Sequence, residues 1–300
     1  MDVFARRDVC EVCGANQYHL LYEKTYSDTI LTHFLEQYYA GRLPIEELRD
    51  GQYEVVQCEK CGFIWQPNIL SDDYMAKLYE EWILPEESRT SFTHSSLHRR
   101  QQFARQVWRL ASHFPERKPH EISILDFGMG WGEWVLMAKA HGFDVCGLEI
   151  SSSRLKHAQE NNIPTITKLE TGYTFDIIFA NQVLEHVPNP FEVFQQIASH
   201  LKPGGIACIS VPNGDAITRE IHNPDWQPGR KAIAVQPLEH INCFTYKTLM
   251  ALGRRVGLTL TQKSQWRYQL ANLLPIPTAN IPKLKGLTLY FTKGTFLLDE

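Results

Sequence analysis

The chain has 300 residues, of which 30 are Lys or Arg and 34 are Asp or Glu, so its formal net charge is −4 at pH 7. This length allows one large or two smaller domains with a substantial core. The balanced charge gives no indication of a nucleic-acid partner, and no apolar run reaches the roughly 20 residues of a membrane-spanning helix. Because the start, MDVFARRD, also lacks the apolar stretch of a signal peptide, we expect a cytoplasmic protein without nucleic-acid or membrane partners.

Two C-x-x-C-G turns, one starting at Cys10 and one at Cys58, mark the N-terminal region. Each turn lets two thiolates converge on one ion, and four thiolates form the closed type of structural zinc site. An odd total of seven cysteines without an export signal also favours metal ligation over disulfides. The alternative, buried or redox-active cysteines, leaves the duplication of the pattern as coincidence. The predicted ligands of one structural Zn²⁺ are Cys10, Cys13, Cys58 and Cys61.

The segments around the second pair predict a small N-terminal module. Residues 28–48 have a helical pattern, and 63–68 read as an edge strand ended by proline. A helix is expected over 71–82. Residues 85–93 are polar and serve as a predicted linker, followed by an amphipathic helix over 97–114. We therefore divide the chain into a zinc-binding module with a helical insert, 1–90, and a second domain, 91–300.

Strands and helices alternate from residue 122 onward, which is typical of a parallel sheet covered on both faces. The fold class predicted is α/β, with a seven-stranded Rossmann-like sheet beside the small zinc-binding domain. The expected strands are 122–127, 144–150, 165–168, 175–181, 206–211, 258–262 and 287–292. The expected helices are 131–141, 152–161, 191–201 and 246–256.

A glycine-rich turn, GMGWG at 128–132, follows the first of these strands, and Glu149 ends the second. Glycines let a backbone approach a ligand closely, and a carboxylate at the second strand can accept both hydroxyls of a ribose. A pyrophosphate fingerprint has its third glycine where this chain has Glu133, whose charge would face a diphosphate. The spacing therefore favours S-adenosylmethionine over NAD and disfavours an NAD-dependent oxidoreductase.

The motifs LDFGMGWGEW, GLEIS, FDIIFANQVLEHVPNP, LKPGG and ISVPN occur in this order over roughly 120–215. With them the chain resembles the class I S-adenosylmethionine-dependent methyltransferases. The C-x-x-C-G pairs resemble the subgroup with an N-terminal zinc module, which includes sugar C-methyltransferases and natural-product methyltransferases. The resemblance implies a methyltransferase that acts on a small molecule or a sugar or glycan, and it leaves the acceptor atom and the oligomeric state open.

The same resemblance implies the cofactor-binding residues. They are Asp126, Gly128, Gly130 and Gly132 around the methionine half, Glu149 at the ribose, Ile150 beside the adenine, and Asn181 and Gln182 in the pocket beyond the fourth strand. The chain departs from the family pattern at Met129 and Trp131, which puts the detailed pocket shape in question. The alternative for Asp126 is a cap on the next turn, and for Glu149 a cap on the helix after Ser151.

Two Glu-His pairs, 185–186 and 239–240, lie near the carboxyl edge of the predicted sheet, where ligands bind. A hydroxyl or acidic-carbon acceptor needs a base. Resemblance to the sugar C-methyltransferases implies His240 as general base, Glu239 as its orienting or substrate-binding partner and His186 as a second polar contact. Their usual tyrosine is Pro237 here, which weakens a C-methylation assignment. For His186 the alternative is that it only orients the following helix.

A different class of function is also consistent with these motifs: a zinc-ribbon scaffold or partner subunit that retains the cofactor without turnover. In either case the long insertion 213–238 lies near the predicted active edge, and such loops often carry substrate contacts. Its weak candidates for these contacts are Asn213, Trp226 and Arg230.

Overall fold

The computed structural model describes residues 2–83, 96–223, 226–228, 234–261 and 286–294. The predicted linker 85–93, the domain boundary at residue 90 and the candidate Arg230 lie outside these residues. Among the described residues, none of the helices combines the length and the apolar character needed to cross a membrane.

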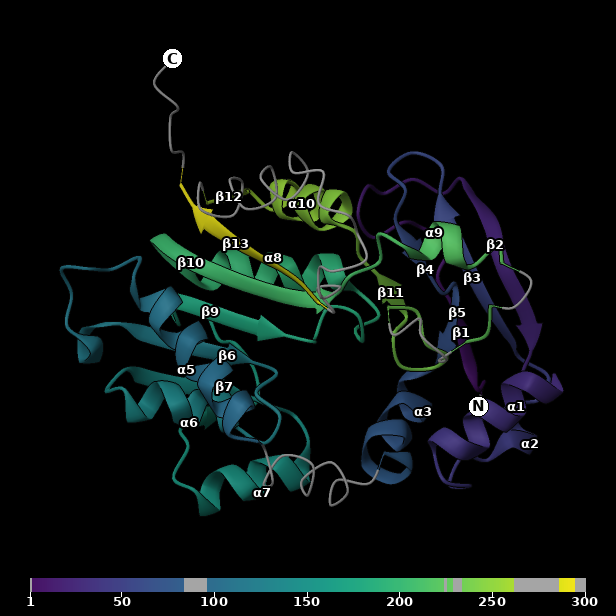
Figure 1. The fold of residues 1–300 in the computed structure, drawn as a ribbon, viewed down its shortest axis with the longest axis horizontal. Coiled ribbons are helices and arrows are strands. Elements are labelled where there is room, and N and C mark those ends of the chain that lie inside the picture. Colours follow the sequence, from purple (N-terminus) through teal and green to yellow (C-terminus); the bar gives the residue numbers. More distant parts are fainter. Residues whose placement is uncertain (1, 84–95, 224–225, 229–233, 262–285, 295–300) are drawn as a thin grey trace.

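The central element is a seven-stranded sheet with the order β12-β13-β10-β9-β6-β7-β8 (Figure 1). The five strands from β10 to β8 run parallel, whereas β13 is antiparallel to both of its neighbours. The predicted α/β class with a seven-stranded Rossmann-like sheet is therefore confirmed. The strands are β6 (Ser123–Phe127), β7 (Asp144–Leu148), β8 (Thr165–Ile166), β9 (Phe175–Asn181), β10 (Leu201–Pro212), β12 (Leu258–Leu260) and β13 (Gly286–Lys293).

Helices cover both faces of this sheet. Successive side chains of a strand point to opposite faces, so each central strand contributes to both cores. On β9, Ile177 and Phe179 pack in the core formed with α5, α6 and α7, whereas Ile178 and Ala180 pack in the core formed with α8 and α10. The run IIFA at 177–180 is thus apolar without alternation, as expected for a strand segment buried on both sides. The helices are α5 (Leu97–Ala111), α6 (Glu133–Ala140), α7 (Ser152–Glu160), α8 (Pro190–His200) and α10 (Tyr246–Arg255).

The N-terminal region forms a four-stranded antiparallel sheet with the order β11-β4-β3-β2 and a two-stranded sheet of β1 and β5. The prediction that 63–68 is an edge strand is wrong, because β11 from late in the chain pairs with β4, with Asn242 opposite Trp65. The strands are β1 (Phe4–Arg6), β2 (Tyr18–Thr25), β3 (Gln52–Cys58), β4 (Ile64–Trp65), β5 (Asn68–Leu70) and β11 (Asn242–Cys243).

Short helices complete the N-terminal region and its surroundings. They are α1 (Thr29–Tyr38), α2 (Ile45–Leu48), α3 (Asp72–Lys77), which continues into a π-helical turn (Leu78–Trp82), and α9 (Ile217–Glu220). Leu35, Tyr39 and Tyr53 share a buried core with Ile217 and Leu238 from the long insertion. The insertion 213–238 and β11 therefore place the segment between them, which contains Glu239 and His240, against the N-terminal sheets.

Candidate functional site

The glycine turn is tied to the neighbouring strand at the carboxyl edge of the sheet. The backbone N–H groups of Gly128 and Met129 both donate to the carbonyl of Leu148, over 2.9 and 3.1 Å. Gly130 has a φ of +59°, a left-handed conformation that favours glycine. An added Cβ at Gly130 would meet nothing within 4 Å, whereas at Gly132 it would collide with a neighbouring isoleucine. The turn is therefore open to a ligand at Gly130.

Glu149 lies directly against this turn. Its Oε2 accepts the N–H of Gly130 over 3.0 Å, and its Oε1 accepts the N–H groups of Ile150 and Ser151 over 2.9 and 3.0 Å. The guanidinium of Arg154 is 3.6 Å from Oε2. The structure thus brings the predicted turn and acid together. The contacts with Ile150 and Ser151 also match the capping alternative, so the ribose role of Glu149 remains a prediction.

Asp126 lies at the end of β6 and is only 3% exposed. Burial, followed by the charge of Glu149, raises the pKa of Asp126 to about 8, and the backbone N–H of Val135 donates to its carboxyl group. The carboxyl group is thus mostly protonated at neutral pH. The contact with Val135 in α6 matches the capping alternative, and binding of the cofactor by Asp126 stays a prediction.

The remaining predicted cofactor residues lie at the same edge of the sheet. Ile150 is 78% exposed, and Asn181 and Gln182 are exposed where β9 ends. Gln182 has a φ of +57° and its N–H donates to the carbonyl of Ser210 over 2.8 Å. An exposed isoleucine, an open glycine and a carboxylate on neighbouring strands fit an adenosyl ligand.

The departures from the family pattern have a packing explanation. The Met129 side chain fills the space beside Gly147, where an added Cβ would be 2.1 Å from its sulfur. Trp131 is 6% exposed and meets the ring of His157 edge-on at 5.3 Å. Both large side chains therefore point into packed surroundings, and the backbone of the turn keeps its open side.

The structure brings together His186, Glu239 and His240, the three residues that the sequence predicts to act on the methyl acceptor; we call them the acceptor-side residues. Nδ1 of His186 is 3.0 Å from the carbonyl oxygen of Glu239, and the rings of His186 and His240 meet edge-on at 4.6 Å. A carbonyl only accepts, so Nδ1 is the donor, and Nε2 is the unprotonated nitrogen of the neutral ring. Burial, followed by the charge of His240, lowers the pKa of His186, which keeps this ring neutral.

Glu185 belongs to the same cluster, although no sequence signal distinguished it from its neighbour. Its side chain is fully buried, and neither carboxyl oxygen has a hydrogen-bond partner among the described residues. Burial raises its pKa to about 8. The ligand atoms of Glu185, His186 and His240 all lie within 4.8 Å of one another. The cluster therefore concentrates groups that can accept or donate a proton.

Tyrosines from the N-terminal region complete the cluster, and of these Tyr39 was not identified from the sequence. The hydroxyl of Tyr39 donates to Oε1 of Glu239 over 2.8 Å, and Tyr79 meets the ring of His186 edge-on at 6.2 Å. The buried Tyr79 hydroxyl has no hydrogen-bond partner among the described residues. Tyr79 is one of several aromatic residues before the glycine turn that could line a substrate site, although their helical spacing also fits core packing.

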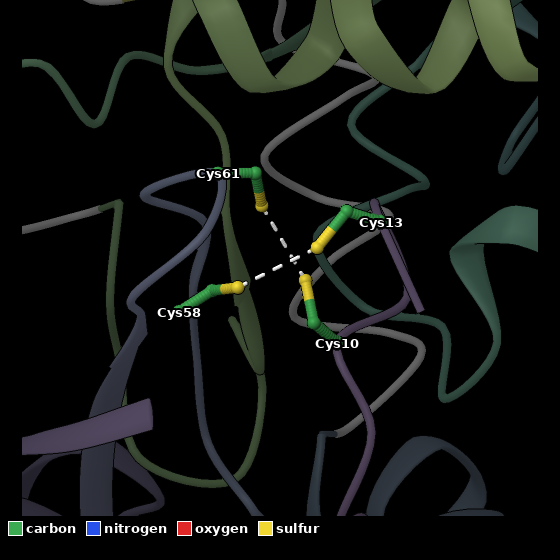
Figure 2. Close-up of side chains that lie close together, drawn as sticks. All are labelled: Cys10, Cys13, Cys58 and Cys61. Carbon is green, nitrogen blue, oxygen red and sulfur yellow. Dashed lines mark hydrogen bonds between the residues drawn. The ribbon is translucent and has the colours of Figure 1, made fainter. Parts of the chain in front are cut away.

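The four N-terminal cysteines converge as predicted (Figure 2). Cys10 and Cys61 have their sulfurs 3.5 Å apart, as do Cys13 and Cys58, and all four sulfurs lie within 4.8 Å of one another. A tetrahedral zinc ion with Zn–S bonds of about 2.3 Å needs sulfurs about 3.8 Å apart. The spacing fits such an ion, and zinc itself remains a prediction for these thiols.

Comparison with known proteins identifies relatives of this chain. A family model described as a methyltransferase domain matches residues 96–263. Ubiquinone biosynthesis O-methyltransferases are similar over 117 residues, at 30% identity in Rickettsia akari and 32% in Rickettsia bellii. Each alignment covers 36% of this chain and 46% and 48% of the relative, so the chain spans about half the length of these curated relatives.

A solved structure supports the same fold. The 1,6-didemethyltoxoflavin-N1-methyltransferase of Burkholderia thailandensis, crystallised with 1,6-didemethyltoxoflavin and S-adenosylhomocysteine, is similar with a TM-score of 0.51 and 20% identity. The alignment covers 80% of this chain and 99% of that one. At this identity the likeness shows the fold alone.

Proposed function

The chain belongs to the methyltransferase domain family, within the class I S-adenosylmethionine-dependent methyltransferases, and on this premise we propose that it methylates a small-molecule acceptor. The observation that carries the proposal is the contact between Gly130 and Glu149 at the open side of the glycine turn. It puts a backbone without a side chain beside a carboxylate at the edge where such sheets bind nucleotide-like ligands.

The cofactor would lie across three neighbouring strand ends. The residues proposed to hold it are Asp126, Gly128, Gly130, Gly132, Glu149, Ile150, Asn181 and Gln182. The open side of Gly130 and the exposed side chain of Ile150 support this assignment. Glu149 would accept the ribose hydroxyls, in exchange for part of its present hydrogen bonds to backbone N–H groups.

The acceptor would bind beside the Glu–His cluster. When bound, S-adenosylmethionine supplies a methyl group already activated by the sulfonium. The chain's part is to align the acceptor, exclude water and take its proton. We assign the proton-accepting role to His240, an orienting role to Glu239 and a polar contact to His186. The hydrogen bond from Tyr39 to Glu239 and the packing of the two imidazole rings support a fixed arrangement of these groups.

The acceptor class follows from what this cluster can do. A general base is useful for a hydroxyl or an acidic carbon, and the Rickettsia relatives are named as O-methyltransferases. We therefore place a hydroxyl-bearing acceptor first, such as a phenol, and a sugar or glycan second. We assign one structural Zn²⁺ to the cluster of Cys10, Cys13, Cys58 and Cys61 in the N-terminal module, residues 1–90. This ion takes no part in catalysis.

The test is formation of S-adenosylhomocysteine, measured by mass spectrometry, when the purified chain is incubated with S-adenosylmethionine and a panel of catechols, phenols and nucleotide sugars. Removal of a general base typically costs between about 100-fold and 10,000-fold in turnover, so we expect His240→Ala to lose at least the lower figure. The control His200→Ala, at the last residue of α8, should keep full turnover.

Two outcomes would contradict this proposal in different ways. Unchanged turnover in His240→Ala and Glu239→Ala would remove the base assignment. Tight binding of S-adenosylmethionine without any turnover of the panel would favour the alternative of a cofactor-retaining scaffold or partner subunit.

A further inference from the structure

Arg7 follows β1 and lies three residues before the first cysteine of the zinc-type cluster. Its guanidinium makes five hydrogen bonds, all to uncharged oxygens. Nε and Nη2 donate to the carbonyl of Gln66 over 3.3 and 2.7 Å, and Nη2 also donates to the carbonyl of Ile241 over 2.9 Å. Nη1 donates to the carbonyl of Pro188 over 2.8 Å and to Oδ1 of Asn242 over 2.9 Å.

Burial of this cation costs free energy that its hydrogen bonds must offset. Desolvation is the first cause that lowers the pKa of Arg7 to about 10, so the group still carries its charge at neutral pH. The nearby charge of Glu11 and the five hydrogen bonds, none of which goes to a carboxylate, together compensate this burial. The planar fork of a guanidinium fixes the relative positions of all the oxygens that it binds. Arg7 thus holds three separate chain segments in one arrangement.

Two of these segments carry the acceptor-side histidines. Pro188 follows His186 by two residues in the loop after β9, and Ile241 directly follows His240. The third segment contributes a further tie, because Nε2 of Gln66 donates to the carbonyl of His240 over 2.9 Å. Arg7 and Gln66 together therefore bind carbonyls of both backbone segments that carry the imidazole rings.

Asn242 closes the network between the two histidine segments. Its Nδ2 donates to the carbonyls of Leu184 and Val187 over 2.9 and 2.7 Å. Its backbone N–H donates to the carbonyl of Glu185 over 3.1 Å. The Oδ1 of the same side chain accepts from Arg7. The loop after β9 is thus held by Asn242, and Asn242 is held by Arg7.

We infer that Arg7 is a positioning residue that sets the distance and angle between His186 and His240 from the N-terminal module. The inference deepens the proposed function and rests on it for its kinetic part. It assigns the cysteine-bearing module a role in turnover, because the short segment that carries Cys10 also carries Arg7. The groups that bind Glu149 come from Gly130, Ile150, Ser151 and Arg154, which are outside this network, so we expect Arg7 substitutions to affect turnover far more than cofactor affinity.

The experiment compares Arg7→Gln and Arg7→Lys with the matched control Arg6→Gln. Arg6 is the neighbouring arginine on β1, with a side chain that is 46% exposed and paired with Glu54. Three properties are measured on the full chain: S-adenosylmethionine affinity by calorimetry, turnover with an acceptor found in the panel, and the imidazole resonances of His186 and His240 in a histidine-labelled sample. Single His→Asn variants assign the resonances.

We expect Arg7→Gln to keep its cofactor affinity and to lose turnover about 100-fold, the effect of misplacing a reacting group by about 1 Å. Arg7→Lys, with a point charge and no fork, should recover only part of this loss. Both substitutions should shift the resonances of His186 and His240, and Arg6→Gln should leave all three properties unchanged. Cofactor affinity that falls in parallel with turnover would contradict the inference, because it would indicate a general folding defect.

The resonances keep the inference testable when turnover is absent. If the wild type turns over no acceptor, the proposed function fails, yet shifted histidine resonances in folded Arg7→Lys would still support the positioning role. Unshifted resonances in the Arg7 variants, or full turnover in Arg7→Gln, would overturn it. Should Arg7→Gln fail to fold, the same measurements on Arg7→Lys, which retains the charge, decide between these outcomes.

Discussion

The hydroxyl of Tyr39 donates a 2.8 Å hydrogen bond to Oε1 of Glu239, and so joins the end of α1 to a residue 200 positions later in the chain. Both side chains are buried, with exposures of 1% and 8%. The N-terminal region therefore contributes a hydrogen bond directly to the side chain of Glu239. This bond adds to those that the Arg7 guanidinium makes with the backbone beside the two histidines.

Tyr39→Phe should destabilise the protein by about 1 to 3 kcal/mol, because it leaves a buried carboxyl oxygen without its partner. It should also lower turnover, since Glu239 would lose this hydrogen bond and keep only its interaction with Tyr38. Urea unfolding and S-adenosylhomocysteine formation measure the two effects. The control is Tyr53→Phe in the same core, because the buried Tyr53 hydroxyl has no hydrogen-bond partner among the described residues. Equal losses in both variants would argue against a specific role for Tyr39.

Gly130→Ala should have two effects that can be measured separately: a loss of stability from backbone strain, and a loss of cofactor affinity from a side chain in the space that the cofactor occupies. Placing a Cβ in the left-handed conformation costs about 1 to 2 kcal/mol of stability, while the space around Gly130 is open. If the cofactor occupies that space, its affinity should fall at least tenfold. Gly204→Ala is the matched control, because Gly204 has a φ of +73° and open space too, but lies away from the site. Retained affinity in Gly130→Ala would place the cofactor elsewhere.

Cys13→Ser should remove one thiolate from the cluster of four and lower the bound zinc from about one ion per chain toward zero. Because a structural zinc ion contributes its binding free energy to folding, the variant should unfold at a markedly lower temperature. Metal analysis and thermal unfolding provide the measurements. Cys146→Ser, at a half-buried cysteine of β7 outside the cluster, should keep the metal. A zinc content that is unchanged in Cys13→Ser would show that the cluster is not the metal site.

S-adenosylmethionine binding should release a proton from Asp126. Its native pKa of about 8 means that the carboxyl group is protonated at pH 7, and a cationic ligand nearby favours the charged form and lowers that pKa. Affinity should therefore rise as the pH increases toward about 8 and level off above it. Glu149 is the charged neighbour that opposes this ionisation, and Val135 donates the hydrogen bond that favours it.

Calorimetry in two buffers of different ionisation enthalpy counts the released protons, and Asp126→Asn should abolish the release. S-adenosylhomocysteine, which lacks the sulfonium charge, should release fewer. Binding without proton release in the wild type would support the alternative that Asp126 only caps α6 through Val135.

The sheet was predictable because its central parallel strands, β6 and β9, are short and mostly apolar runs bounded by turn residues. FDIIFA of β9 and ILDF of β6 could hardly be placed elsewhere than in a covered sheet, and the order of the motifs then located Glu149 beside the turn. The contact between Gly130 and Glu149 follows from the pairing of β6 with β7, a local feature of the chain.

The acceptor side was predictable only in part. The pairs at 185–186 and 239–240 are visible as sequence motifs, but the tyrosine hydroxyl at 39 and the guanidinium at 7 reach them through tertiary packing. The error at β4 has the same cause, because its outer neighbour is a two-residue strand from the far end of the chain. Nothing in a short segment such as INCF indicates that it will complete a distant sheet.

The most direct test of the proposed cofactor site is calorimetric titration of the purified chain with S-adenosylmethionine, beside NAD and beside the variant Glu149→Gln. We predict one bound S-adenosylmethionine per chain, no binding of NAD, and an affinity at least tenfold lower when the carboxylate that meets Gly130 becomes an amide. Absence of binding to S-adenosylmethionine, or equal affinity in Glu149→Gln, would contradict the proposed site.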